Sequence, residues 1–367
     1  MFDWIPVSIY TPVHYYMLFV IVLFVLVNSC LTEIDNQINL KLLQLCIGTY
    51  VIILILYMGL RPISGTYFGD TANYAIAYYR MQAGEEVKIE KDYAFNYFMK
   101  WCSGVMNVSS FYLLLDVLYV MPMLLFSKKF FGQFWWLGAL FMISSFSFWA
   151  AGTNGLRNGL GTSIFLLGLF FYRQKWLLYP LFALSYFMHA SLVIPIAAFV
   201  ISGLYKNPKV YLAIWLLAIP LSLAGGSAWA TFFANLGFAE DRTQGYLTGG
   251  SDEYNSQFSQ SGFRWDFLLY SASAIFAGWY FILKKKITDK FYIHLFGIYC
   301  IANAFWILVI TAAFSNRFAY LSWFLMPVVI AYPMFRYKIW PRQFPYLGII
   351  LFLYYLFTFI MNIFVYA

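Results

Sequence analysis

The sequence predicts an all-α protein, a polytopic bundle of transmembrane helices. Its 367 residues are 63% hydrophobic and only 10% charged, and the mean hydropathy is +0.72. This composition excludes a water-soluble globular protein. The apolar runs are continuous and roughly 18–24 residues long, which suits helices that cross a bilayer, whereas a β-barrel needs short alternating segments. We therefore expect a single membrane-embedded domain over residues 1–367.

The apolar runs define about ten full spans, since each run is long enough for one crossing. They cover residues 14–31, 42–60, 109–127, 133–151, 157–172, 209–226, 265–283, 291–314, 317–335 and 344–365. The segment 176–205 is also apolar, but at roughly 1.5 Å per residue it is too long for one crossing. We expect two short helices that meet at His189, a hairpin that enters the membrane and returns. A single tilted span is the alternative.

The basic residues orient these spans, because Lys and Arg concentrate in cytoplasmic loops. Five short connections carry them: Lys128–Lys129, Arg173–Lys175, Lys206–Lys209, Lys284–Lys290 and Arg336–Arg342. Most of the positive charges behind the net charge of +8 lie in these short loops, as the topology of a membrane protein requires. No nucleic-acid partner is therefore expected. The loops 61–108 and 227–264 then face outward. Within the first of them, we expect 93–108 to form an amphipathic helix on the outer surface rather than a poor span.

Three arginines, Arg157, Arg264 and Arg317, each begin a span from the outer side. A guanidinium can bind phosphate oxygens in a forked geometry, and a helix amino-terminus favours an anion. The arginines therefore predict a diphosphate pocket at the membrane surface. The alternatives are three separate anchors to lipid headgroups and, for Arg264, simple neutralisation by Asp266.

Two further residues are candidates for proton transfer. His189 lies in an otherwise apolar stretch, where an imidazole can accept a proton near neutral pH. Its alternative role is a hydrogen bond to the backbone at the hairpin turn. Asp70, in the outer loop, can act as a general base or can cap the helix that begins near Thr71. No spacing of His, Cys or acidic residues suggests a metal site, so no metal and no cofactor are expected.

These motifs resemble the EpsG-like branch of the bacterial Wzy-type polysaccharide polymerases. The resemblance covers roughly residues 50–335 and is carried by four short motifs. They are Gly65…Gly69-Asp70-Thr71…Asn73-Tyr74, Gly155-Leu156-Arg157, His189-Ala190-Ser191 and Asn316-Arg317…Tyr320. The sequence departs from the family pattern at Asn158, where Gln often follows the arginine.

The resemblance implies a GT-C-like glycosyltransferase that joins oligosaccharide repeats carried on undecaprenyl diphosphate. The reaction would take place at the outer face of the bacterial inner membrane, and a chain-length regulator is a candidate partner. By the matching positions, Arg157 and Arg317 bind the diphosphate, and Asp70 or His189 is the base. The acceptor site would be shaped by Tyr74, Arg264 and Asp266, with Asn316 and Tyr320 also binding substrate.

Two other functions remain open at this point. A membrane O-acyltransferase that modifies a surface glycan is one, because many such enzymes carry an intramembrane histidine. A flippase for lipid-linked oligosaccharides is the other. Transporters usually show internal repeats and broken helices at the midplane, and of these features only the hairpin at 176–205 is expected here.

Overall fold

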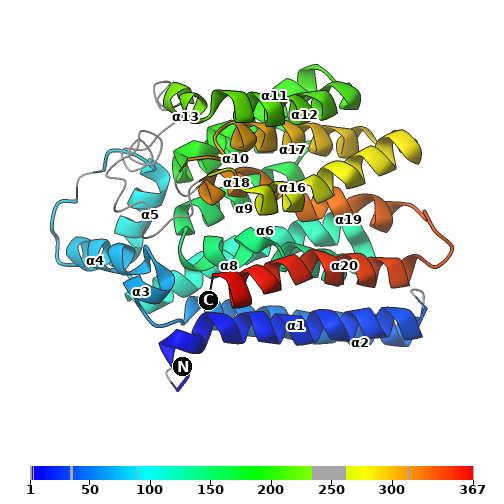
Figure 1. The fold of residues 1–367 in the computed structure, drawn as a ribbon. Coiled ribbons are helices and arrows are strands. Elements are labelled where there is room, and N and C mark those ends of the chain that lie inside the picture. Colours follow the sequence, from blue (N-terminus) through cyan, green and yellow to red (C-terminus); the bar gives the residue numbers. More distant parts are fainter. Residues whose placement is uncertain are drawn as a thin grey trace. The chain divides into compact units, whose positions relative to one another are not determined.

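The computed structural model describes residues 2, 4–33, 36–87, 89–233, 262–312 and 315–366. Every regular element in these ranges is helical, as Figure 1 shows. Eight helical stretches among them are long and apolar enough to cross a membrane. They are Val7–Leu31, Gln37–Gly59, Val108–Ile143, Pro208–Gly225, Trp265–Lys284, Lys290–Leu308, Asn316–Arg336 and Gln343–Val365. The expectation of an all-α, polytopic membrane bundle is confirmed.

The chain divides into two compact units, and each is described by itself. The first unit comprises Met1–His189 and Met334–Ala367, and the second comprises Ala190–Pro333.

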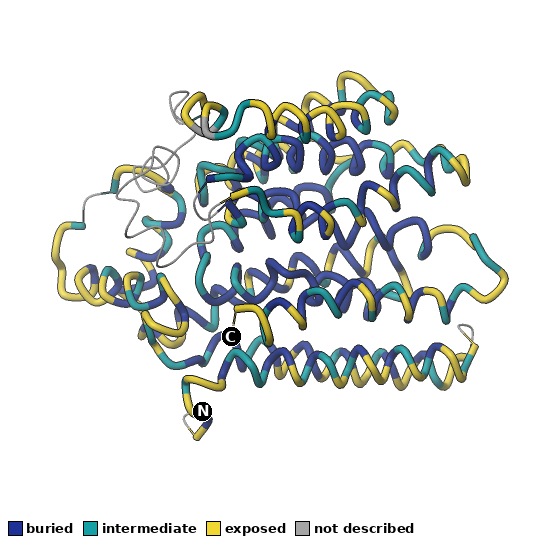
Figure 2. The backbone as a smooth tube through the Cα atoms, viewed as in Figure 1, coloured by how far each residue is buried: buried dark blue, intermediate teal, exposed yellow. Residues whose placement is uncertain are grey.

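The first unit is built on helices that pack in pairs, some of them distant in the sequence. Helix α1 packs against α20, α2 against α6, α6 against α9, and α9 against α10. Their bounds are α1 Val7–Leu31, α2 Gln37–Gly59, α6 Val108–Phe131, α9 Leu156–Phe170, α10 Lys175–Met188 and α20 Gln343–Ile360. Helix α20 continues as a π-helix over Met361–Val365. Figure 2 shows exposed residues along α1 and α2, the surface that lipid would cover.

Asparagine fixes where several of these helices begin. Asn36 accepts hydrogen bonds from the backbone N–H groups of Ile38 and Asn39, and Asn107 accepts one from Ser110. These side chains satisfy N–H groups that the first helical turn leaves without a partner.

One expected span, 133–151, is a broken helix. After a short turn at Gly132–Phe134, α7 (Trp135–Ile143) ends before Ser144, and α8 begins at Phe146 and ends at Thr153. The carbonyl of Ser144 accepts a hydrogen bond from Thr358 Oγ1 of α20 at 3.0 Å. A break inside a membrane is tolerated when neighbouring helices satisfy the released backbone groups in this way.

The predicted helix break at His189 is present. Helix α10 ends at Met188, and His189 has an extended backbone with φ −155°. A short turn at Ala190–Leu192 leads into α11 (Val193–Leu204). The return of the chain after this break stays a prediction. The run 157–172 is likewise shorter than expected, because α9 has only 15 residues.

The segment 61–108 forms a helical cap at one end of the first unit, beyond the ends of α1 and α2 (Figure 1). It contains α3 (Gly65–Phe68), α4 (Thr71–Gln82) and α5 (Tyr93–Ser103). Helix α5 has 11 residues, which is too short to cross a bilayer, so it is not a membrane span. Its location on the outer surface of the membrane stays a prediction.

Helix α5 is amphipathic, as the sequence predicted. It buries Phe95 and Met99 and exposes Tyr97 and Trp101. Aromatic side chains of this kind collect at membrane–water interfaces.

The second unit is organised around α17 (Lys290–Leu308), which packs against α11, α12 (Pro208–Gly225), α16 (Trp265–Gly278) and α18 (Asn316–Trp323). Its other elements are α13 (Ser227–Phe233), a π-helix over Trp279–Lys284, and α19 (Met326–Arg336), whose last residues belong to the first unit.

Asn303 on α17 is fully buried and links three helices. It accepts a hydrogen bond from Trp215 Nε1 at 2.7 Å and donates to Ser271 Oγ and Ser322 Oγ. Such contacts hold membrane helices together where apolar burial does not.

Candidate functional site

An apolar cluster beneath the candidate site positions its polar residues. Its members come from α4, α5, α6, α9 and α10, and include Tyr78, Phe95, Leu156, Leu160 and Met188. The polar residues Tyr74, Asp92, Arg157 and His189 each lie one to three positions from a buried member of this cluster. The cluster therefore brings together side chains from four segments that are far apart in the sequence.

Asp92 is the centre of the site. Arg157 Nη1 donates a hydrogen bond to Asp92 Oδ2 at 2.5 Å, and His189 Nδ1 lies 3.4 Å from the same oxygen. The Asp92 side chain is fully buried, while those of Arg157 and His189 keep 26% and 14% of their surface exposed. The carboxylate is thus covered by an arginine and a histidine that both reach solvent.

Sequence reasoning missed Asp92. The residue follows a charged stretch, Glu85 to Lys91, and directly precedes α5, so the local pattern favours a solvated loop ending in a helix cap. Its side chain makes no cap hydrogen bond. Only the tertiary packing of α5 against α4 and α10 reveals its role.

The backbone at Asp92 is unusual. Its φ is +50°, a left-handed conformation that is uncommon for residues other than glycine. The side chain of Asn96, one turn later, donates to the carbonyl of Lys91 at 2.9 Å and to that of Asp92 at 3.2 Å. These two hydrogen bonds hold the turn that directs Asp92 toward Arg157.

Tyr74 on α4 is the second anchor of Arg157. Its hydroxyl accepts a hydrogen bond from Arg157 Nε at 3.1 Å, and the guanidinium carbon lies 5.9 Å from the ring centroid. Burial raises the pKa of Tyr74, and nearby Asp70 raises it further, while Arg157 opposes both. Arg157 is therefore held by two different groups on two different nitrogens, a geometry that lysine cannot reproduce.

Asp70 lies next to this site and is fixed by its backbone. Its N–H donates to Asn154 Oδ1 at 2.8 Å, and its Oδ1 accepts from Asn73 Nδ2 at 3.2 Å. Asp70 occupies the N-cap position of α4, but its side chain makes no cap hydrogen bond. The contact with Asn154, three residues before Arg157, places Asp70 and Arg157 at the same end of the first unit.

Two more hydrogen bonds join the corner before α9 to the corner before α4. The carbonyl of Thr153 accepts from Thr71 Oγ1 at 2.5 Å and from Arg61 Nη2 at 3.1 Å. Arg61 also forms an ion pair with Asp116 on α6, and both side chains are fully buried. These contacts fix the start of α9 and hence the base of the Arg157 side chain.

Gly159, two residues after Arg157, serves helix packing. A Cβ atom at Gly159 would lie 2.4 Å from the carbonyl oxygen of Ala151, so this glycine allows α9 to contact α8. Asn158, where the sequence departs from the family pattern, is partly buried.

The remaining predicted residues belong to the second unit. Arg264 donates from Nε and Nη2 to the two carboxylate oxygens of Asp266, at 2.9 and 2.5 Å, and lies 3.8 Å over the ring of Phe267. This is the neutralising pair that the sequence offered as an alternative.

Asn316 Nδ2 donates to the Tyr320 hydroxyl at 3.2 Å. Arg317 is exposed on α18. Most of the predicted loop 227–264, residues 234–261, lies outside the described residues.

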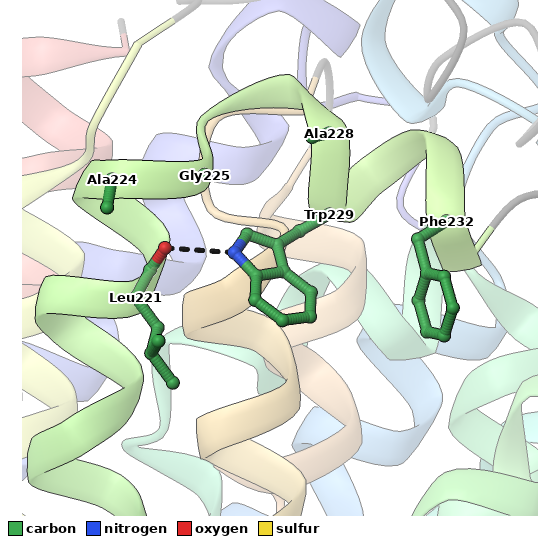
Figure 3. Close-up of a pocket in the computed structure, with 6 residues that line it drawn as sticks. All are labelled: Leu221, Ala224, Gly225, Ala228, Trp229 and Phe232. Atoms are coloured by element: carbon green, nitrogen blue, oxygen red, sulfur yellow. Dashed lines mark hydrogen bonds between the residues drawn. The ribbon is translucent and has the colours of Figure 1, made fainter.

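A hollow of about 380 Å³ lies in the second unit, where α12 meets α13 (Figure 3). It is lined by Leu221, Ala224, Gly225, Ala228, Trp229 and Phe232. Trp229 points into it and donates from Nε1 to the carbonyl of Leu221 at 2.9 Å. Its lining holds no titratable side chain, so it offers no acid–base chemistry.

In the described part of the chain, no three His, Cys, Asp or Glu side chains are grouped closely enough to hold a metal ion. The site around Asp92 presents a guanidinium, a carboxylate, an imidazole and a phenol.

Comparison with known families supports the resemblance. The sequence matches the EpsG family over residues 44–367, which is most of the chain. It belongs to the EpsG family. No curated protein and no solved structure matches it. The EpsG match contains Tyr74, Asp92, Arg157 and His189. Together with the eight apolar helices of the described residues, it indicates a multi-pass membrane protein.

Proposed function

We propose that this protein is a membrane glycosyltransferase that polymerises oligosaccharide repeat units carried on undecaprenyl diphosphate. Its membership of the EpsG family supports this proposal at the level of a membrane polysaccharide polymerase. The observation that carries the reaction is the position of Arg157. It lies in the first turn of α9, is partly exposed, and shares Asp92 with His189.

Arg157 has the chemistry to bind the lipid diphosphate. The guanidinium offers several N–H donors in a plane, and the first turn of α9 adds N–H groups that favour an anion. Gly155 at the N-cap position offers no side chain that would occupy those groups. In the transition state the leaving diphosphate gains negative charge, and a preorganised donor acts most strongly on charge that develops there.

The reaction itself needs one base and one leaving group. A hydroxyl oxygen of the acceptor sugar forms a bond to the anomeric carbon of the donor. The bond from that carbon to the diphosphate oxygen breaks, and its electron pair leaves with the lipid diphosphate. The hydroxyl proton passes to Asp70 or His189. Both residues lie in the first unit with Arg157. The assignments in the second unit stay as the resemblance implies: Arg317 binds the diphosphate, and Arg264 and Asp266, with Asn316 and Tyr320, bind the substrate.

The proposed location is the outer face of the bacterial inner membrane. Helix α6 supports this placement, since its first residue follows the cap of α3, α4 and α5, while its last turn carries Lys128 and Lys129. If α6 crosses the membrane with its basic end in the cytoplasm, the cap and Arg157 face the periplasm or the exterior.

The test is reconstitution of the purified protein with lipid-linked repeat units. We expect products longer than the input from the wild type. Arg157→Ala and Arg157→Lys are both expected to lower the rate by about 10²-fold or more, because the ammonium cannot contact Tyr74 and a diphosphate together. Arg80→Lys is the matched control, because Arg80 is an exposed arginine paired with Glu85 on the same cap.

The products also separate the competing functions. Repeat units that gain acyl groups without lengthening would indicate an acyltransferase, and repeats that cross the membrane unchanged would indicate a flippase. Long polymer from both Arg157 variants would refute the role of this residue.

A further inference from the structure

One oxygen atom of Asp92 is shared by two side chains. Arg157 makes a short, charge-assisted hydrogen bond to Oδ2 at 2.5 Å, whereas His189 Nδ1 lies 3.4 Å from it. The first distance is typical of a strong ionic hydrogen bond, and the second is long for an N–H···O contact. Of these two side chains, Arg157 is the closer partner of Oδ2, and His189 is close enough to become its partner when Arg157 moves.

Resting on the proposed function, we infer that the substrate diphosphate displaces the Asp92 carboxylate from Arg157. The carboxylate then pairs with His189 instead. A diphosphate carries more negative charge than a carboxylate and competes for the same N–H donors. The Asp–His pair then forms when the lipid-linked donor is bound. The pairing of His189 with Asp92 is therefore coupled to the binding of the diphosphate by Arg157.

The burial of Asp92 favours a transfer to His189 over a simple release. Its side chain is fully buried, and a buried carboxylate that loses the charged group paired with it is strongly unfavourable. His189 Nδ1 is already within 3.4 Å of the oxygen that Arg157 would leave. The left-handed backbone of Asp92, with φ +50°, is of the strained type that occurs at ligand-binding and switch residues.

The exchange gives His189 the properties of a base. A carboxylate that accepts a hydrogen bond from Nδ1–H fixes the tautomer of the ring and leaves Nε2 as the basic nitrogen. His189 Nε2 then takes the proton of the acceptor hydroxyl as the new glycosidic bond forms. The electron pair of the broken bond leaves with the diphosphate on Arg157. Asp92 stabilises the imidazolium and is thus a positioning residue, and the base is His189 rather than Asp70.

The first experiment uses the wild-type protein and inorganic pyrophosphate as the probe. The sequence has three histidines, so a sample with labelled histidine gives three imidazole signals in nuclear magnetic resonance spectra. His14 and His294 are buried elsewhere and serve as internal controls. We expect pyrophosphate to shift the His189 signal and to leave the other two in place. A His189 signal that stays unmoved while pyrophosphate binds would overturn the exchange.

The second experiment removes the charge of Asp92. Asp92→Asn is expected to bind pyrophosphate roughly tenfold more tightly than the wild type, because the competing carboxylate is gone. Its KM for the lipid-linked donor should fall, while its kcat falls by about 10²-fold, because His189 has lost its partner. Glu85→Gln removes an exposed carboxylate beside Arg80 and should change neither value.

Opposite results would identify Asp92 as a plain structural anchor. In that case Asp92→Asn would weaken pyrophosphate binding, and kcat and affinity would fall together. If the variant does not fold, the wild-type histidine spectra decide the question alone. The pyrophosphate titrations do not require polymerisation, so the two hypotheses can fail separately. If the protein shows both pyrophosphate results but does not lengthen repeat units, the exchange of partners at Asp92 is supported and the proposed function is refuted.

Discussion

Asn154 lies so close to Gly69 that a Cβ atom at residue 69 would be 2.4 Å from the Asn154 Oδ1 atom. The same oxygen accepts the N–H of Asp70 at 2.8 Å. Gly69 also has φ +53°, which disfavours other residues. This contact joins the corner before α4 to the corner before α9, and it brings Tyr74 to Arg157.

Gly69→Ala is therefore expected to disturb both corners. Gly84→Ala is the matched control, because Gly84 has φ +82° but nothing within 4 Å of the added Cβ. Both variants should be destabilised by about 1 kcal/mol or more from the backbone strain. Only Gly69→Ala should also displace Asn154, and polymer formation should fall in that variant alone. Equal activity losses in the two variants would contradict this account.

The sequence predicted the parts of the fold that depend on local pattern. The long apolar helices, the amphipathic helix α5 and the break at His189 follow from apolar length, amphipathic spacing and the polar residue in an apolar run. Within the described residues, eight stretches meet the length for a span where about ten were expected, because α9 is short and α7 and α8 are separated at Ser144. The carbonyl of Ser144 at this break is satisfied by Thr358 on the distant helix α20, so the local sequence around residue 144 does not reveal the break.

The site was harder to predict, because its central contact spans distant segments. Arg157 and His189 are unusual in their local sequences and could be singled out, whereas Tyr74 was found through the family resemblance. Asp92 could not, because 65 residues separate it from Arg157 and 97 from His189. Asn154 was missed for the same reason, since its partner is a backbone N–H 84 residues away.

The buried ion pair between Arg61 and Asp116 should make the first unit sensitive to the loss of either charge. The two side chains are fully buried and meet at 3.1 Å. Asp116→Leu leaves a buried guanidinium without its counter-ion, which typically costs about 3–5 kcal/mol. Thermal unfolding in detergent measures this cost. The double variant Arg61→Met/Asp116→Leu should be more stable than Asp116→Leu alone, and a still less stable double variant would argue against charge burial as the cause.

Asn303 is expected to stabilise the second unit through its three hydrogen bonds. Asn303→Leu leaves Trp215 Nε1 without its acceptor and removes the links to Ser271 and Ser322. A buried donor without a partner costs about 1–3 kcal/mol. Unfolding by denaturing detergent should show a loss of this size. Asn362→Leu is the control, since its single hydrogen bond goes to Thr358, one turn earlier on the chain. A similar loss in both variants would contradict a special role for Asn303.

The proposed orientation can be tested with two cysteines at the opposite ends of α6. The cap of α3, α4 and α5 precedes the first residue of α6, and Lys128 lies in its last turn, so a spanning α6 separates them by a full bilayer. In a background with serine in place of the native cysteines, Glu86→Cys should react with a membrane-impermeant maleimide in cells whose outer layers have been made permeable. Lys128→Cys should react only after the inner membrane is opened, because its loop faces the cytoplasm. The reverse labelling pattern would place Arg157 and Asp70 in the cytoplasm together, since Asn154 ties their corners to one another, and it would refute polymerisation at the outer face.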